Sequence, residues 1–518
     1  MKKTRYLLLT TLTLLTLVSL WACKKSFFET GRTDGTIVES SSFTVKSDFD
    51  QALIGAYTPL QGQDAFGGGV QIKVPNAVMQ DMIAGGDEKP FSGSLAAYMQ
   101  GNADMQAYYR MYFQIAANSN VVISKLADVQ PGVLTEAENN LIRGQAKFLR
   151  GYAYFNLARA FGDVPMPLAI YEPSQNTLPC TKKADIFKQV IADLMDAEAN
   201  LPEANVYGSG DRGRVTRGAA LAYLANTYMY TEEWAKAKIE TDKLMALTKP
   251  KYALAADPQT PFSIKNKNTP EYIAENIFEI QGRDGSDRQF QWGGTPNTGT
   301  LVPVFTTPGV GAKFTPVSNG GWGEWIINKK AVESFEPGDK RLTKMIVKHG
   351  GTNYRGEFFT EDMTADAWKN NQKFNSAWTT KYWLGPAPTA VPGGASFLSH
   401  QYLPQMRFAE VLLNYAEIQF KLGNLTGPEG AYEYLNKVRR RAGLPEILTS
   451  ANFIATLMNE RRHELVMEPN LWWHYTRTGT AKAFLKNEHG VDMEDRWVHF
   501  PIPGREKAFN PNICSNGY

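Results

Sequence analysis

Arg407-Phe408-Ala409-Glu410-Val411-Leu412-Leu413-Asn414-Tyr415-Ala416-Glu417 is the most informative run of this chain. Small residues alternate in it with Leu and Tyr, at a spacing that suits a helix packed on another helix. A turn at residues 422–424 then leads to a second helical pattern that begins with Ala431-Tyr432. We therefore predict a helix, a tight turn and a second helix in this region.

A second pair has the same composition. Residues 221–228 lead through a turn into Trp234-Ala235-Lys236-Ala237. Both pairs resemble hairpins of the tetratricopeptide type. The pairs start 191 residues apart (221 to 412) and share no fixed period, so we do not expect a simple tandem array.

Hydrophobic periodicity extends this interpretation along the chain. Thr135 begins the clearest further helix, which we expect to end at Gly162, shortly before Pro165. The expected helices cover residues 43–61, 104–126, 135–161, 184–200, 216–247 (as a pair), 407–422, 428–442 and 451–476. Residues 62–101 and 250–400 are rich in Gly and polar residues and are expected to be mainly loops, and the tail after Val491 is expected to be extended. The predicted fold class is mostly α.

Composition excludes some functions. The 518 residues hold 55 Lys and Arg against 52 Asp and Glu, with 12% aromatic residues. Such a chain can bury a core. Three of the basic residues lie in an N-terminal segment that we expect to be removed, so the mature chain is neutral. A neutral chain lacks the positive field of a nucleic-acid-binding protein.

The N-terminus is typical of an export signal. A basic start is followed by 16 uncharged residues, 7–22, which is short for a membrane span. The run ends in Leu20-Trp21-Ala22-Cys23, which resembles the processing site of a lipoprotein. Cys23 would then become the lipidated first residue and anchor the protein to a membrane. The two remaining cysteines, Cys180 and Cys514, could pair or both be free.

Three longer blocks make the chain similar to the SusD/RagB family of outer-membrane nutrient-binding lipoproteins. The first is Arg150-Gly151-Tyr152-Ala153-Tyr154-Phe155-Asn156-Leu157 with Phe161-Gly162-Asp163-Val164-Pro165. The second is the opening run with residues 435–443 and Glu460-Arg461-Arg462-His463-Glu464-Leu465. The third is the tail, with Phe500-Pro501-Ile502-Pro503 and Asn516-Gly517-Tyr518.

The resemblance implies a SusD-like fold, with divergent tetratricopeptide-like helical pairs as scaffold and large irregular loops forming the ligand face. Residues 1–22 would be the signal peptide and 23–518 a single domain, helical over 41–248, loop-rich over 249–400, helical over 401–480 and extended over 481–518. Charged residues on apolar helical faces need partners. Buried ion pairs between helices are therefore expected at Arg150, Glu410, Glu417, Arg461 and Glu464.

The resemblance also implies a function without catalysis. The family captures glycans, or in some members peptides, at the cell surface and delivers them to a SusC-like TonB-dependent transporter. No catalytic residue, metal site or cofactor is expected. The run His463-Glu464-Leu465-Val466-Met467 resembles a zinc-protease motif, but Met467 replaces the second histidine ligand.

Glycan recognition needs flat aromatic side chains beside groups that can bind pairs of hydroxyls. Residues 284–297 of the loop-rich region offer this combination, and polar residues of 72–88 and one glycine-flanked tryptophan add to it. The candidate ligand-binding residues are Asp287, Arg288, Gln289, Phe290, Trp292, Trp322, Asn76 and Asp81. Trp378, Tyr382 and Trp383 form a further aromatic cluster.

Three alternatives remain open. A peptide-capturing member of the family would have a deep cleft in place of an aromatic platform. A glycoside hydrolase would need two carboxylates at a defined separation, and nothing in the sequence nominates such a pair. A lid without its own ligand affinity would leave selection to the transporter.

Overall fold

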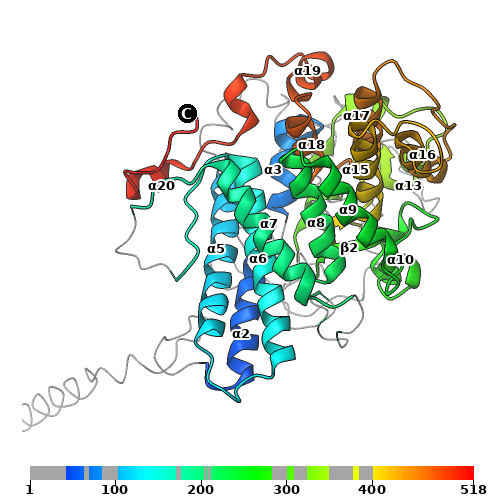
Figure 1. The fold of residues 1–518 in the computed structure, drawn as a ribbon. Coiled ribbons are helices and arrows are strands. Elements are labelled where there is room, and N and C mark those ends of the chain that lie inside the picture. Colours follow the sequence, from blue (N-terminus) through cyan, green and yellow to red (C-terminus); the bar gives the residue numbers. More distant parts are fainter. Residues whose placement is uncertain are drawn as a thin grey trace, which may run out of the picture.

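The computed structural model describes residues 43–62, 69–84, 103–170, 177–203, 207, 211, 213–282, 300–307, 324–348, 377–383 and 401–518. Helices make up most of these residues, as predicted (Figure 1). Within the described part of the chain, the model contains no helix with both the length and the apolar character needed to cross a membrane.

The first half of the chain forms a series of long helices. These are α2 (Lys46–Tyr57), α5 (Ala103–Ala127), α6 (Glu136–Phe161), α7 (Lys183–Asn200), α8 (Arg217–Tyr230) and α9 (Trp234–Ala246). From α5 onward each helix packs against the next in the chain. The predicted start of α6 is confirmed, because the Thr135 hydroxyl accepts from the Glu138 backbone N–H and the Glu138 carboxylate accepts from the Thr135 N–H. The helix ends at Gly162, whose φ of 78° suits glycine.

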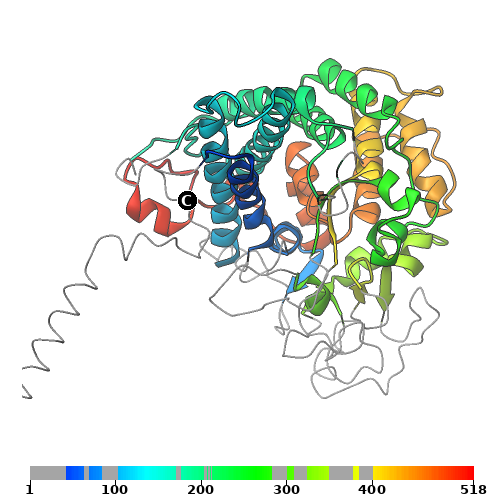
Figure 2. The same cartoon turned by 90° about the horizontal axis from the view of Figure 1, so that it is seen from below.

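The second half continues the series. The helices are α15 (Phe408–Lys421), α16 (Ala431–Ala442), α17 (Phe453–Glu464) and α18 (Leu471–Arg477). Helix α15 packs against α9, α16 and α17, which joins the two halves. Figure 2 shows the long helices as an arc that runs from the N-terminal helices to α16. The hairpins α8–α9 and α15–α16 are the two pairs predicted from the sequence.

Two small antiparallel sheets complete the frame. Strands β1 (Met82–Ala84), β3 (Trp325–Ile327), β5 (Ala377–Thr379) and β4 (Ile346–Lys348) form one sheet in the order β1-β3-β5-β4. Met82 pairs with Ile327, and Ile346 pairs with Thr379. Strands β2 (Asn276–Ile280) and β6 (Leu403–Arg407) form the other sheet, and β6 leads directly into α15.

Short helices fill the connections. They are η2 (Thr58–Gln61), α3 (Val70–Met79), η6 (Thr260–Phe262), η7 (Ile264–Asn266), α10 (Pro270–Glu275), α11 (Val302–Thr306), α12 (Lys329–Glu333), α13 (Lys340–Met345), α19 (Ala481–Phe484), η11 (Leu485–His489), η12 (Asp495–Val498) and α20 (Gly504–Phe509).

Three expectations about local structure were wrong. Residues 62–101 contain α3 and β1, although we expected mainly loops there. Because α3 is buried on nearly all sides, its sequence does not show the alternation of polar and apolar residues by which an amphipathic helix is predicted. The helix expected over 451–476 is two helices, interrupted where Met467 has a φ of 60° and Pro469 follows. The tail after Val491 contains η12 and α20.

The tail is fastened to the helices by a disulfide. Cys514 is bonded to Cys180, which settles the pairing that the sequence left open. Beside it, the Asn510 amide donates to the Leu178 carbonyl at 2.8 Å, and the Phe500 N–H donates to the Ala160 carbonyl at 2.6 Å. The C-terminal segment therefore belongs to the folded unit.

Candidate functional site

In the sequence, the predicted ligand loops adjoin strands of the four-stranded sheet and strand β2. Residues 85–102 follow β1, residues 308–323 precede β3, and residues 349–376 connect β4 to β5. Residues 283–299 follow β2. These segments lie outside the described residues, and with them six of the predicted ligand contacts: Asp287, Arg288, Gln289, Phe290, Trp292 and Trp322. Their contact with a ligand stays a prediction.

Asn76 and Asp81, the other two predicted contacts, lie within the described residues and are buried. The Asn76 amide donates to the Ile72 carbonyl at 2.8 Å and to the Glu468 carbonyl at 2.9 Å. The first bond is within α3, and the second ties α3 to the segment before α18. Asn76 thus has a structural role, and a ligand contact at this residue also stays a prediction.

Asp81 joins the start of β1 to α17. Arg462 donates to both of its carboxylate oxygens, at 2.8 and 2.7 Å, and the His489 ring lies 3.1 Å from one of them. Burial acts to raise the pKa of Asp81, but Arg462 and His489 outweigh it and lower this pKa to about 2. The carboxylate is therefore ionised at neutral pH and fixes the position of the first loop-bearing strand.

The aromatic cluster near β5 is also buried. Trp378, Tyr382 and Trp383 are each at most 4% exposed. The Tyr382 hydroxyl donates to the Met467 carbonyl at 2.9 Å, and the Trp383 indole N–H donates to the Thr306 carbonyl at 3.1 Å. These side chains connect the sheet to the helices behind it.

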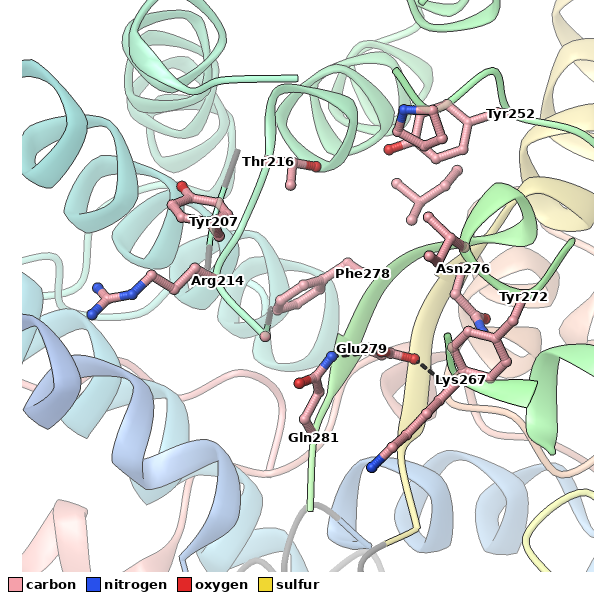
Figure 3. Close-up of a pocket in the computed structure, with 14 residues that line it drawn as sticks. Tyr207, Arg214, Thr216, Tyr252, Lys267, Tyr272, Asn276, Phe278, Glu279 and Gln281 are labelled. Atoms are coloured by element: carbon pink, nitrogen blue, oxygen red, sulfur yellow. Dashed lines mark hydrogen bonds between the residues drawn. The ribbon is translucent and has the colours of Figure 1, made fainter. Parts of the chain in front are cut away.

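A cavity lies beside β2, next to the start of α8, and Thr216 is part of its lining (Figure 3). Figure 3 shows Phe278 near its middle, Tyr207 and Arg214 on one side, and Tyr272 and Lys267 on the other. The sequence did not nominate this place, because its lining residues come from five segments between residues 207 and 281 that share no local pattern.

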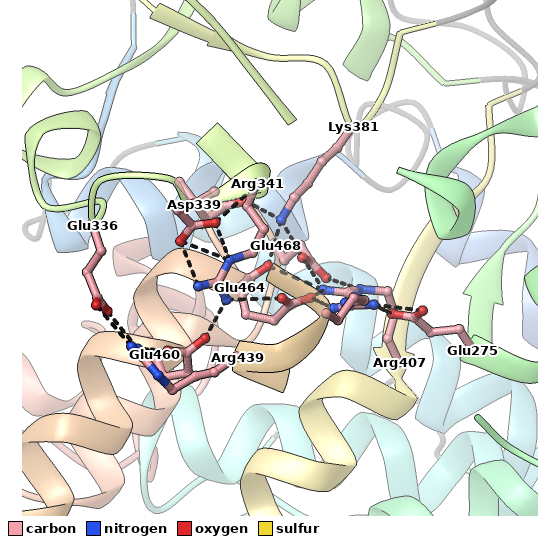
Figure 4. Close-up of polar contacts among 12 residues, drawn as sticks. Glu275, Glu336, Asp339, Arg341, Lys381, Arg407, Arg439, Glu460, Glu464 and Glu468 are labelled. Carbon is pink, nitrogen blue, oxygen red and sulfur yellow. Dashed lines mark hydrogen bonds and ion pairs between the residues drawn. The ribbon is translucent and has the colours of Figure 1, made fainter. Parts of the chain in front are cut away.

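Behind the sheet, a buried network of charged side chains connects the loop base to α17 (Figure 4). Lys381, two residues after β5, is fully buried. Its ammonium group donates to the Glu464 and Val466 carbonyls, both at 2.9 Å, and to the Glu468 carboxylate at 2.6 Å. Burial lowers the pKa of Lys381 to about 8, although Glu468 opposes this shift. The sequence did not identify Lys381, because its loop has no periodic pattern.

Glu464 is the centre of this network. Its carboxylate contacts Arg407 at 3.0 Å and Arg341 at 3.3 Å, and it also pairs with Arg441. Burial acts to raise the pKa of Glu464, but the surrounding guanidinium groups hold it well below its usual range. The predicted ion pair at this residue is confirmed.

The predicted ion pairs at Arg150, Glu417 and Arg461 are also present. Arg150 of α6 donates to both carboxylate oxygens of Asp193 in α7, each at 2.7 Å. Arg461 contacts Glu417 at 3.1 Å. Glu410 lies 2.9 Å from the His474 ring, but burial and neighbouring arginines hold the pKa of His474 well below its usual value, so this contact is a hydrogen bond to a neutral ring and not the predicted ion pair. These contacts join neighbouring helices and give the charged residues of the sequence a structural role.

One group of potential metal ligands lies nearby. Carboxylate oxygens of Glu336 and Glu460 and a ring nitrogen of His463 are within 4.8 Å of one another. Arg439 already pairs with both carboxylates, at 2.6 and 2.9 Å, and Arg341 pairs with Glu460. A cation would face two guanidinium groups there, so these residues form part of the ion-pair network and do not fit a metal site.

Family models match both halves of the chain. The model described as "SusD family" matches residues 270–504, and the model described as "Starch-binding associating with outer membrane" matches residues 33–229. A SusD-like protein P2 from Formosa agariphila is 23% identical over 508 residues, which cover 93% of this chain and 94% of that relative.

Solved structures match over the same length. A laminarin binding SusD-like protein has a TM-score of 0.74 at 22% identity, covering 92% of this chain and 100% of its own. Surface glycan-binding protein A from Bacteroides thetaiotaomicron, solved in complex with laminarihexaose, has a TM-score of 0.73 at 23% identity with the same coverage. The arc of helical hairpins, the quoted sequence blocks and both family models agree, and the chain belongs to the SusD/RagB family.

Proposed function

We propose that this protein binds glycans at the cell surface, where a lipid anchors it to the outer membrane. It binds its ligand without a catalytic step. It would capture an oligosaccharide or polysaccharide and deliver it to a SusC-like TonB-dependent transporter. The observation that carries the proposal is the full-length likeness to a structure solved with laminarihexaose bound. Cys23 at the end of the export signal supports the lipid anchor.

The architecture suits capture by loops on a rigid base. Two strands of the sheet are held to the helices, since Asp81 precedes β1, Lys381 follows β5, and their partners lie in and just after α17. A fixed base lowers the conformational entropy that the loops lose when a ligand binds. Aromatic side chains such as Trp292 and Phe290 would cover the C–H faces of sugar rings, and Gln289, Asp287 or Arg288 would bind their hydroxyls.

Affinity electrophoresis of residues 24–518 in gels that contain neutral polysaccharides tests this function. We expect one polysaccharide to retard the protein, and Trp292→Ala to abolish the retardation. Trp234→Ala is the matched control, since this half-buried tryptophan lies in α9, next to Lys421 of α15 and away from the loop-bearing sheet. The control variant should migrate like the unaltered protein.

The same gels separate the alternatives. Retardation without released sugar supports binding without hydrolysis. Release of sugar that one carboxylate substitution abolishes would show an enzyme. No retardation by any polysaccharide would contradict the proposal, and binding of oligopeptides would then identify a peptide-capturing member.

A further inference from the structure

The cavity beside β2 is lined by described residues, none of which is a predicted ligand contact. It offers about 90 Å³ to the centres of water-sized molecules, several times the roughly 10–15 Å³ that a single water needs. Four aromatic rings contribute to its wall: Tyr207, Tyr252, Tyr272 and Phe278. Such a space can hold a small cyclic molecule against aromatic faces.

Polar groups in the wall are held in place by neighbours. The Tyr272 hydroxyl donates to one oxygen of the Glu279 carboxylate at 2.6 Å, and the Gln281 amide donates to the other at 2.8 Å (Figure 3). Each oxygen keeps a second lone pair that can accept from a ligand hydroxyl. Burial raises the pKa of Glu279 to about 7, so this carboxyl can also be protonated and donate near neutral pH.

We infer that the cavity is a second carbohydrate subsite, which binds a single neutral sugar ring through the Glu279 carboxyl and the surrounding aromatic faces. The inference rests on the proposed glycan-binding function and adds to it a site whose described lining contains none of the predicted ligand contacts. Aromatic rings beside fixed acceptors are the combination that sugar recognition requires.

The charged residues of the wall favour a neutral ligand. Arg214 points away from Phe278 in Figure 3 and pairs with Asp211 at 2.7 Å. The Lys267 ammonium lies 3.3 Å from the Tyr402 hydroxyl and 5.1 Å from the centre of its ring. Both cations thus have contacts of their own, and the acceptors that remain suit hydroxyl groups better than a carboxylate.

Saturation-transfer NMR of residues 24–518 with methyl β-D-glucopyranoside, and with the corresponding galactoside, mannoside and xyloside, tests the inference. Asn276→Leu removes an amide of the cavity wall, and Ile273→Trp fills the cavity from its wall. Asn512→Leu is the matched control, because this exposed asparagine also donates one bond to a backbone carbonyl, that of Thr177 at 2.8 Å. Thermal unfolding checks that each variant is folded. If only one of the two cavity variants folds, that variant is sufficient to test the inference.

We expect at least one glycoside to bind, with its dissociation constant raised about tenfold or more by a cavity variant. Asn512→Leu should leave this constant unchanged. Binding that Trp292→Ala abolishes and the cavity variants do not would overturn the inference and leave the proposed function intact. So would retardation in polysaccharide gels without binding of any glycoside, since the cavity would then hold only water. Absence of both signals would contradict the proposed function as well.

Discussion

Replacing Glu464 by Gln tests whether the buried charge network holds the loop base on the helices. Gln keeps the size of the side chain and removes its charge. Five cations take part in the network, Lys381 and four arginines, against six carboxylates. Of these carboxylates only that of Glu336 is well exposed, at 36% of its side chain. The substitution leaves five carboxylates for five cations, and Arg341, Arg407 and Arg441 each lose one buried partner.

The expected decrease in the free energy of unfolding depends on the contacts that remain. Removing one member of a buried ion pair costs about 3–5 kcal/mol. Arg341 keeps Asp339 and Glu460, and Arg407 keeps Glu275 and Glu468, so we expect the lower end, about 3 kcal/mol. An unfolding entropy of about 2.1 cal/mol/K per residue gives about 1 kcal/mol/K for this chain, and the loss corresponds to a Tm lower by about 3 °C.

Differential scanning calorimetry at pH 7 measures this shift. Glu336→Gln is the matched control, because Glu336 pairs with the same network from its exposed rim and should contribute less than about 1 kcal/mol. If Glu464→Gln lowers Tm no more than Glu336→Gln does, the buried network does not stabilise the fold in the way argued here.

Three further perturbations have defined outcomes. Cys514→Ser opens the disulfide that spans 334 residues, and we expect the free energy of unfolding to fall by about 2–4 kcal/mol and the tail to be cleaved faster by proteases. The double variant with Cys180→Ser should be no less stable than the single variant. A rate of tail proteolysis that does not change would contradict the role of the bond. The lowered pKa of Asp81 contributes about 2 kcal/mol of stability above pH 4, which is lost as the pH falls towards 2. Asp81→Asn should remove this part of the acid sensitivity measured by urea unfolding, whereas Asp495→Asn, with a side chain 94% exposed, should not. Cys23→Ala should move the protein from the membrane fraction to the soluble fraction, and persistence in membranes would argue against a lipid anchor.

Much of the helical scaffold could be predicted from local patterns. Thr135 with Glu138, and Gly162 before Pro165, mark the ends of α6 because capping depends on residues close in the chain. Helix α3 escaped prediction because it is buried on nearly every side and has no polar face. The partners of the charged residues could not be predicted either, because they are distant in the sequence: Arg462 and Asp81 are 381 residues apart.

The amino-acid sequence was sufficient for the fold class, for the two helical hairpins and for the expectation that lone charges on apolar helices are paired, because periodicity and desolvation act through neighbouring residues. It also carried the family resemblance, which the comparisons confirmed. The tertiary structure alone decided that Cys180 meets Cys514, that Lys381 belongs to the charge network around Glu464, and that Asn276 and Glu279 line one cavity with Tyr207. Each of these contacts joins segments whose approach depends on how the whole arc of helices packs, and no local pattern in the chain encodes that approach.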